Sequence, residues 1–117
     1  SLDILVHSIA FAPKEDLQGG LLDCSAEGFA KAMDVSCHSF VRMARLAAPL
    51  MKSGGTMMAM SYHGATKVVP TYSVMGPVKA ARMAVICSAV GRTSLDATTS
   101  PSASNVLVWL PKLIVNS

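Results

Sequence analysis

Two short apolar segments flank one long amphipathic segment, and this order constrains the fold more than any other feature of the chain. Residues 2–6 and 56–61 have the length and composition of buried strands, and the pattern between them predicts a helix over about 26–48. Ser25 can cap this helix, whose apolar positions recur at helical spacing: Phe29, Met33, Phe40, Val41, Ala44 and Ala48. Because a crossover of this length joins parallel strands, we expect the loops after the two strands to share the ligand-binding edge of the sheet.

Two further segments complete the expected architecture. Residues 13–24 are polar and turn-prone, which predicts a loop. From Thr71 we expect a second helix, because Pro70 just before it is tolerated at a helix start. One face of this helix would carry Tyr72, Met75, Val78 and Lys79. The pattern as a whole predicts an α/β fold with parallel strands.

Composition excludes several classes of protein. Apolar types make up 51% and charged types only 15% of the 117 residues, which indicates one domain with a buried core and excludes disorder. The formal net charge of +3 comes without a basic run, so we expect no nucleic-acid partner. We expect no membrane partner and a cytoplasmic location, because neither a run of about 18 apolar residues nor a secretory signal occurs.

The cysteines and histidines predict no metal site. No C-x-x-C pair and no H-x-x-x-H pair occurs among the six residues, which are Cys24, Cys37, Cys87, His7, His38 and His63. We interpret the cysteines as free structural thiols. We expect His7 to be a hydrogen-bonded residue at a strand end.

Tyr72 and Lys79 are the strongest candidates for chemistry. A separation of seven residues on a helix returns to nearly the same face, about 10.5 Å further along the axis. A neighbouring lysine favours the phenolate form of a tyrosine, and its ammonium can bind the vicinal hydroxyls of a sugar while the phenol reaches a carbonyl oxygen. On spacing alone, the more common alternative is an exposed helix with a packing tyrosine and a solvated lysine.

Two further candidate positions lie at the expected ligand edge. Tyr62 directly follows the second strand and can add a hydroxyl or an aromatic wall to a cleft. Ser8, Ile9 and Ala10 follow the first strand and offer a hydroxyl, a backbone and small side chains to a flat ligand ring. The alternatives are an aromatic side chain that closes a strand end and an ordinary strand exit.

Four segments of the chain share one family pattern. They are Leu-Val-His-Ser-Ile-Ala-Phe-Ala-Pro-Lys-Glu at 5–15, Met-Asp-Val-Ser-Cys-His-Ser-Phe at 33–40, Ser-Tyr-His-Gly-Ala at 61–65, and Val-Val-Pro-Thr-Tyr-Ser-Val-Met-Gly-Pro-Val-Lys-Ala-Ala at 68–81. Together they closely resemble the bacterial NADH-dependent enoyl-[acyl-carrier-protein] reductases of the short-chain dehydrogenase/reductase superfamily. The Tyr-x6-Lys spacing separates this family from the Tyr-x3-Lys pattern of ordinary short-chain dehydrogenases.

The resemblance implies a fold, a reaction and a set of roles. The fold would be a three-layer Rossmann-type domain, and the reaction would reduce a trans-2-enoyl thioester on acyl carrier protein with NADH, in fatty-acid synthesis. By position, Tyr72 would bind the thioester carbonyl and stabilise the enolate, and Lys79 would hold the nicotinamide ribose. Tyr62 would line the acyl pocket, and Ser8, Ile9 and Ala10 would lie along the cofactor. The family forms homotetramers, and the resemblance leaves the assembly of this chain open.

The resemblance covers only part of the chain. We interpret residues 1–81 as the central part of a Rossmann-type reductase domain and residues 82–117, which are rich in Ser and Thr, as a divergent tail. The first strand and glycine-rich dinucleotide-binding turn of the family would lie before Ser1, so we expect an incomplete doubly wound sheet and little or no turnover by this chain alone. The alternative functions are an inert or ligand-binding remnant and another short-chain reductase.

Overall fold

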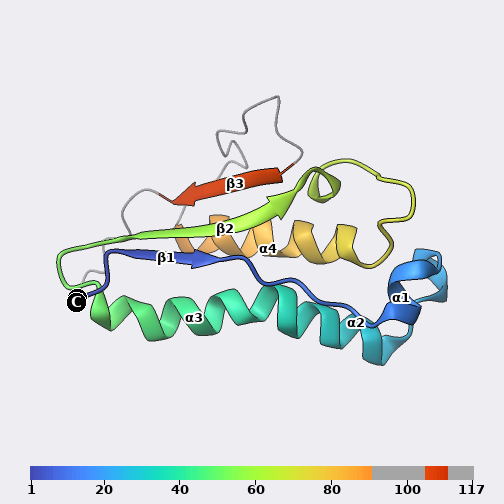
Figure 1. Cartoon of the computed structure of the whole chain (residues 1–117), viewed down its shortest axis with the longest axis horizontal. Helices are drawn as coiled ribbons and strands as arrows, with labels where there is room; N and C mark the ends of the chain where they lie inside the picture. The colour runs from blue at the N-terminus through green and yellow to red at the C-terminus, as the bar shows by residue number, and fades with distance from the viewer. Residues whose placement is uncertain (91–104, 111–117) are drawn as a thin grey trace.

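A computed structural model describes residues 1–90 and 105–110 of the chain (Figure 1). Its elements, in chain order, are β1 (Ile4–His7), α1 (Lys14–Gln18), η1 (Leu21–Asp23), α2 (Ala26–Met33), η2 (Asp34–His38), α3 (Ser39–Ala47), η3 (Ala48–Leu50), β2 (Thr56–Tyr62), η4 (His63–Ala65), α4 (Met75–Val90) and β3 (Asn105–Leu110). Of the four η elements, η2 is π-helical and the others are 3-10 turns. Both expected strands and both expected helices are present, with differences in their bounds.

The three described strands form one sheet in the order β1, β2, β3. β1 and β2 are parallel, with Leu5 opposite Met57 and His7 opposite Ala59. This pairing confirms the predicted strand, helix, strand unit and brings the carboxyl ends of β1 and β2 to the same edge of the sheet. β3 runs antiparallel to β2, so the described sheet is mixed where we expected parallel strands alone. An antiparallel edge strand on an otherwise parallel sheet is a common variant.

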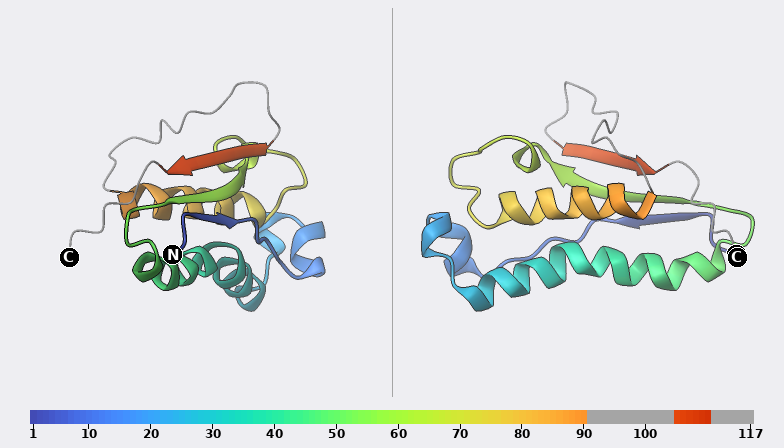
Figure 2. Two further views of the ribbon diagram at one scale, coloured as in Figure 1. Left: turned by 60° about the vertical axis from the view of Figure 1, so that its left-hand side comes forward. Right: turned by 180° about the vertical axis from the view of Figure 1, so that it is seen from behind.

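The long helices cover one face of the sheet (Figures 1 and 2). Met57 and Ala59 of β2 pack in one buried cluster with Phe40 of α3 and with Met83 and Ile86 of α4. On the opposite face, Ile4 and Val6 of β1 keep 57% and 53% of their surface exposed. The described residues therefore form two layers, helices and sheet, of the expected three-layer fold.

The first long helix begins as predicted. Ser25 precedes α2, and its side chain accepts a hydrogen bond from the amide of Gly28 at 2.9 Å. This bond satisfies one of the amides that have no partner within the first turn of a helix. The cap that we predicted from the sequence is confirmed.

A π-helical turn interrupts this helix at its centre. α2, η2 and α3 follow one another without a break in the chain (Figure 1), but η2 winds wider than an α-helix. The apolar face is therefore shifted: Phe40 is buried, while Phe29 and Val41 are 37% and 38% exposed. Phe29 does not share the buried face of Phe40, because the π-helical turn between them breaks the period of 3.6 residues that we assumed. Val41 differs from Phe40 because neighbouring residues of a helix are about 100° apart.

The second long helix begins at Met75, four residues later than predicted. Pro77 explains the difference, because in a helix begun at Thr71 its ring would clash with the carbonyl of Ser73, whereas it is tolerated in a first turn. Thr71 and Ser73 instead have positive φ angles of 65° and 40°. Tyr72 lies between them, outside α4, so the predicted pairing of Tyr72 with Lys79 on one helix face is wrong.

Residues 13–24 also differ from the expectation of a loop. They contain the short helix α1 and the turn η1, and Asp16 of α1 is only 7% exposed. An oxygen of the Asp16 carboxylate accepts a hydrogen bond from the amide of Ser25 at 2.7 Å. The segment is therefore held against the start of α2.

The division of the chain at residue 81 stays a prediction. α4 runs through that position to Val90, and the apolar run at 106–110 lies within β3. The polar run at 93–104 and the apolar residues 113–115 lie outside the described residues.

Candidate active site

The candidate residues lie around the carboxyl ends of β1 and β2. Tyr62 is the last residue of β2, and Ser8, Ile9 and Ala10 follow the last residue of β1. Lys79 projects from α4, which packs on β2. Tyr72 comes from the turn that leads into α4. The parallel pairing of the two strands thus brings together segments that are far apart in the sequence.

The two tyrosines of the chain pack against each other. The rings of Tyr62 and Tyr72 have centroids 4.7 Å apart and planes tilted by 53°. Gly64 makes this contact possible, because a Cβ at that position would lie 2.5 Å from Cδ1 of Tyr72. The two rings are therefore in contact, and the catalytic roles of both tyrosines stay predictions.

The phenol of Tyr72 is held in its protonated form at neutral pH. Burial of the ring raises its pKa above the ordinary value, and the neighbouring Tyr62 adds to the rise. The positive charge of Arg82 acts in the opposite direction. A protonated phenol can donate a hydrogen bond to a carbonyl oxygen.

The amine of Lys79 is buried, with 8% of the residue exposed. Its Nζ donates to the backbone oxygen of Met60 on β2, at the long distance of 3.5 Å. Burial and, to a smaller extent, the positive charge of Arg82 together lower the pKa of Lys79 to about 8. Lys79 thus points toward the end of β2. Its ammonium carries three hydrogens, and the bond to Met60 uses only one of them.

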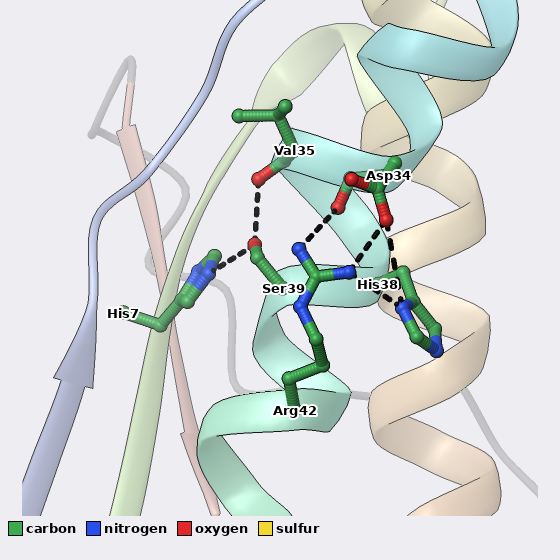
Figure 3. A network of polar contacts seen from close by, with 6 residues as sticks. All are labelled: His7, Asp34, Val35, His38, Ser39 and Arg42. Atoms are coloured by element: carbon green, nitrogen blue, oxygen red, sulfur yellow. Dashed lines mark hydrogen bonds and ion pairs between the residues drawn. The ribbon is translucent and has the colours of Figure 1, made fainter.

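His7 belongs to a buried polar network, and Figure 3 shows its contact with Ser39. Its Nε2 is 2.8 Å from Oγ of Ser39, and that hydroxyl donates to the backbone oxygen of Val35 at 2.6 Å. Since the hydroxyl has only one hydrogen, it accepts from Nε2, and Nδ1 carries no hydrogen. Burial, followed by the charge of Arg82, lowers the pKa of His7. The prediction of a hydrogen-bonded histidine at the strand end is confirmed.

On the outer side of the same helical turn, a second and exposed network joins Arg42 to Asp34 and His38 (Figure 3). The guanidinium of Arg42 lowers the pKa of the Asp34 carboxyl, chiefly through their hydrogen bond. Exposed pairs of this kind contribute little to stability.

The segment after β1 exposes its side chains and has a fixed backbone. Ser8, Ile9 and Ala10 are all exposed. The amide of Phe11 donates to Oγ of Ser36 at 2.8 Å, and that hydroxyl donates to the oxygen of Phe11 at 2.9 Å. The segment therefore presents a hydrogen-bonded backbone at the carboxyl edge of the sheet.

Arg82 is a residue that our sequence analysis missed. It is fully buried and donates to the backbone oxygen of Ile9 at 3.0 Å. The positive charge of Arg82 also lowers the pKa of the candidate residues Tyr72 and Lys79 and that of His7. Helical spacing could have identified it, because Arg82 lies on the same helix face as Val78 and Lys79. We missed it because we ended the family resemblance at residue 81.

A cavity of about 560 Å³ opens beside Tyr72. Its walls come from the loop after β2, from Gly19 and Gly20, and from Gly76 and Ala80 at the start of α4. Tyr62, Lys79 and residues 8–10 do not line it. Of the candidate residues, the cavity therefore adjoins Tyr72 alone.

Among the residues that the structure describes, no three His, Cys, Asp or Glu side chains gather as a metal site would require. Within the same part of the chain, no helix has the length and apolar character needed to cross a membrane.

The parallel strand pair with its helical crossover defines a Rossmann-type α/β domain, with the candidate groups at its carboxyl edge. Within that class, the chain belongs to the family described as enoyl-(acyl carrier protein) reductase, whose model matches residues 1–90.

Relatives and solved structures support the assignment. The NADH-dependent enoyl-[acyl-carrier-protein] reductase FabI of Aquifex aeolicus is 55% identical over 82 residues, which are 69% of this chain and 30% of that protein. The crystal structure of the Anaplasma phagocytophilum reductase in complex with NAD aligns with a TM-score of 0.72 at 48% identity, over 74% of this chain and 33% of that one. For the Bacillus cereus reductase with NADP+ and indole naphthyridinone, the TM-score is 0.76 at 35% identity, over 78% and 35% of the two chains. This chain thus spans about a third of the length of these proteins.

Proposed function

We propose that this chain carries the part of an NADH-dependent enoyl-thioester reductase that faces the substrate and the nicotinamide. The observation that carries the proposal is the packing of Tyr72 on Tyr62, with ring centroids 4.7 Å apart, beside the carboxyl edge of a parallel strand pair. Burial, which raises the pKa of Tyr72, keeps its phenol available as a hydrogen-bond donor. Family membership and the identities to NADH-dependent reductases support the same reaction class.

In the proposed reaction, Tyr72 acts on the thioester carbonyl of a trans-2-enoyl substrate. When bound, NADH would supply the hydride that adds to the β-carbon. As the carbon–carbon double bond is consumed, its electron pair moves toward the carbonyl oxygen, and the hydrogen bond from Tyr72 stabilises the resulting enolate. A proton from solvent would then add to the α-carbon, which completes the saturated acyl thioester.

Three groups of the chain fit the nicotinamide end of NADH. Lys79 has a buried ammonium whose recorded bond, to the oxygen of Met60, is long at 3.5 Å, so it can donate to ribose hydroxyls. Oγ of Ser61 is buried and has no hydrogen-bond partner within the described residues. Residues 8–10 provide an exposed, ordered backbone along which a flat ring can lie. Tyr62 would then form a wall of the acyl pocket.

The partners and the assembly belong to the same proposal. The substrate carrier would be acyl carrier protein, the location would be the cytoplasm, and nucleic acid would have no role. The family's homotetramer stays an open prediction for this chain.

The test has a binding arm and a turnover arm. NADH is added to the ¹⁵N-labelled chain, and we expect amide shifts at residues 8–10 that Lys79→Met reduces. Lys52→Met, which replaces an exposed lysine, is the matched control. In the turnover arm, we follow NADH oxidation with a trans-2-enoyl thioester and expect little or none. Any measurable rate should fall about 100-fold in Tyr72→Phe, as it does when one oxyanion donor is lost.

The outcomes separate the alternatives. NADH-induced shifts that depend on Lys79 support the proposal even without turnover. The absence of any NADH-induced shift would instead identify an inert remnant. Oxidation of NADH with ketone substrates and none with enoyl thioesters would point to another short-chain reductase.

A further inference from the structure

The side chain of Arg82 is the largest fully buried side chain among the described residues. It projects from α4, three residues after Lys79, and α4 begins only at Met75. A guanidinium keeps its charge in proteins, and taking a charge out of water is unfavourable unless other groups compensate for it. The surroundings of Arg82 therefore need an explanation.

One atom of Arg82 joins three other segments of the chain to α4. Its Nη1 donates to Nδ1 of His7 and to the backbone oxygen of Ile9, both at 3.0 Å. The backbone oxygen of Ser36 is a third acceptor at 3.2 Å, and because Nη1 carries only two hydrogens, two of the three acceptors share one of them. These acceptors belong to β1, to the segment after β1 and to η2.

The groups around Arg82 compensate its buried charge only in part. Within residues 1–90, no carboxylate forms an ion pair with Arg82, and its Nε and Nη2 have no hydrogen-bond partner. An apolar side chain of similar volume often stabilises such a position as well as a buried charge does, or better. Packing alone therefore does not account for an arginine here.

We propose that Arg82 is a positioning residue, which holds the backbone of Ile9 against the helix that carries Lys79. The candidate cofactor segment and the candidate ribose-binding amine then keep one fixed geometry. That these two groups bind NADH rests on the proposed function. The link that Arg82 makes between them, which we call the tie, does not rest on it.

His7 is a built-in reporter of this tie. Its bare Nδ1 accepts from Arg82, and its Nε2 donates to Ser39 of α3. The charges that face it are those of Arg82 and Lys79, both from α4, and both oppose protonation of the ring. The ring of Phe40 packs edge-on at 5.6 Å and carries no charge. Loss of Arg82 should therefore be visible in the titration of His7.

The experiment compares Arg82→Met with Arg82→Lys in the full chain. In Arg82→Met we expect the pKa of His7 to return toward the ordinary value of about 6.5. We also expect backbone order parameters of residues 8–10 to fall below about 0.6, without a lower melting temperature. Arg82→Lys keeps the charge, but its shorter side chain does not bring a donor to the position of Nη1, so the pKa of His7 should stay lowered while the order parameters fall. Histidine ¹⁵N spectra and ¹⁵N relaxation give the two readouts.

Arg42→Met is the matched control, because Arg42 bonds Asp34 and His38 on the exposed side of the same helix. It should change neither readout. An unchanged His7 titration and unchanged order in Arg82→Met would overturn the inference, and so would a cooperative loss of fold in both Arg82 variants. If the Arg82 variants behave as expected but NADH causes no amide shifts in the wild-type chain, the proposed function is refuted and the role of Arg82 stands.

Discussion

At the scale of single residues, the missing side chain of Gly64 decides where Tyr72 lies. A Cβ at Gly64 would lie 2.5 Å and 2.7 Å from two ring carbons of Tyr72, and 3.2 Å from a ring carbon of Tyr62. No real Cβ is found at the shorter distances, so one ring has to move. The candidate catalytic phenol therefore depends on a residue that has no chemistry of its own.

We expect Gly64→Ala to lower the free energy of unfolding by about 1–3 kcal/mol, because the added methyl overpacks the contact between the two rings. Near-ultraviolet circular dichroism should change as well, since both tyrosines of the chain are affected. Gly76→Ala is the control. A Cβ there meets its nearest atoms at 3.5 Å and 3.9 Å, and the substitution should stabilise α4 by about 0.5–1 kcal/mol. Equal effects of the two substitutions would contradict this interpretation.

Lys79 makes a prediction about pH. Its pKa in the folded chain is about 8, below its ordinary value of 10.5, so the unfolded chain binds more protons between these values. Stability contributed by this group therefore rises as the pH increases from about 8 toward 10. The check is the difference in unfolding free energy between the wild-type chain and Lys79→Met, measured from pH 7 to 10. A difference that stays constant over this range would show that the lysine is not desolvated.

At the scale of elements, the start of α2 has two polar caps in series. Ser25 accepts from the amide of Gly28, and Asp16 accepts from the amide of Ser25. The bond from Ser25 lowers the pKa of the Asp16 carboxyl. The sequence was sufficient to predict the first cap, because it joins residues three positions apart. It did not reveal Asp16, which lies nine positions away in a segment that we expected to be a loop.

We expect Ser25→Ala to lower the free energy of unfolding by about 1 kcal/mol, the usual effect of losing an N-terminal cap. Ser25→Asp keeps a side-chain acceptor and should retain most of the stability, although it places a carboxylate beside Asp16. Urea unfolding measures both variants. If Ser25→Ala left the stability unchanged, the bond from the amide of residue 25 to Asp16 would be sufficient to hold the start of the helix.

The bounds of the other helices show where periodicity fails as a guide. A π-helical turn at 34–38 changes the phase between Phe29 and Phe40, and Pro77 sets the start of α4. We recognised no sequence pattern that predicts the π-helical turn. The start of α4 could have been predicted from Pro77, because proline is accepted in the first turn of a helix and disfavoured further along it.

At the scale of the whole molecule, β1 is an edge strand within the described residues. Ile4 and Val6 on the face away from the helices are 57% and 53% exposed. An apolar face beside an open strand edge favours association between chains.

We therefore expect the isolated chain to associate in a concentration-dependent manner, and Val6→Lys to weaken that association. Val68→Lys adds the same charge at a position that is 99% exposed, outside the sheet, and serves as the control. Sedimentation velocity at several concentrations measures the effect. Equal sedimentation of the two variants would place the association elsewhere on the molecule.

The sequence by itself determined the strand, helix, strand order, the parallel pairing, the Ser25 cap and the family pattern, because each depends on residue spacing over one or two turns or on a motif. Only the tertiary structure decided which face of the sheet is covered, where Tyr72 lies, and that Arg82 is buried. These features depend on contacts between distant residues: His7 meets Ser39 across 32 positions and Arg82 across 75. Such contacts form only when separate segments exclude water together, and no local pattern of side chains encodes them.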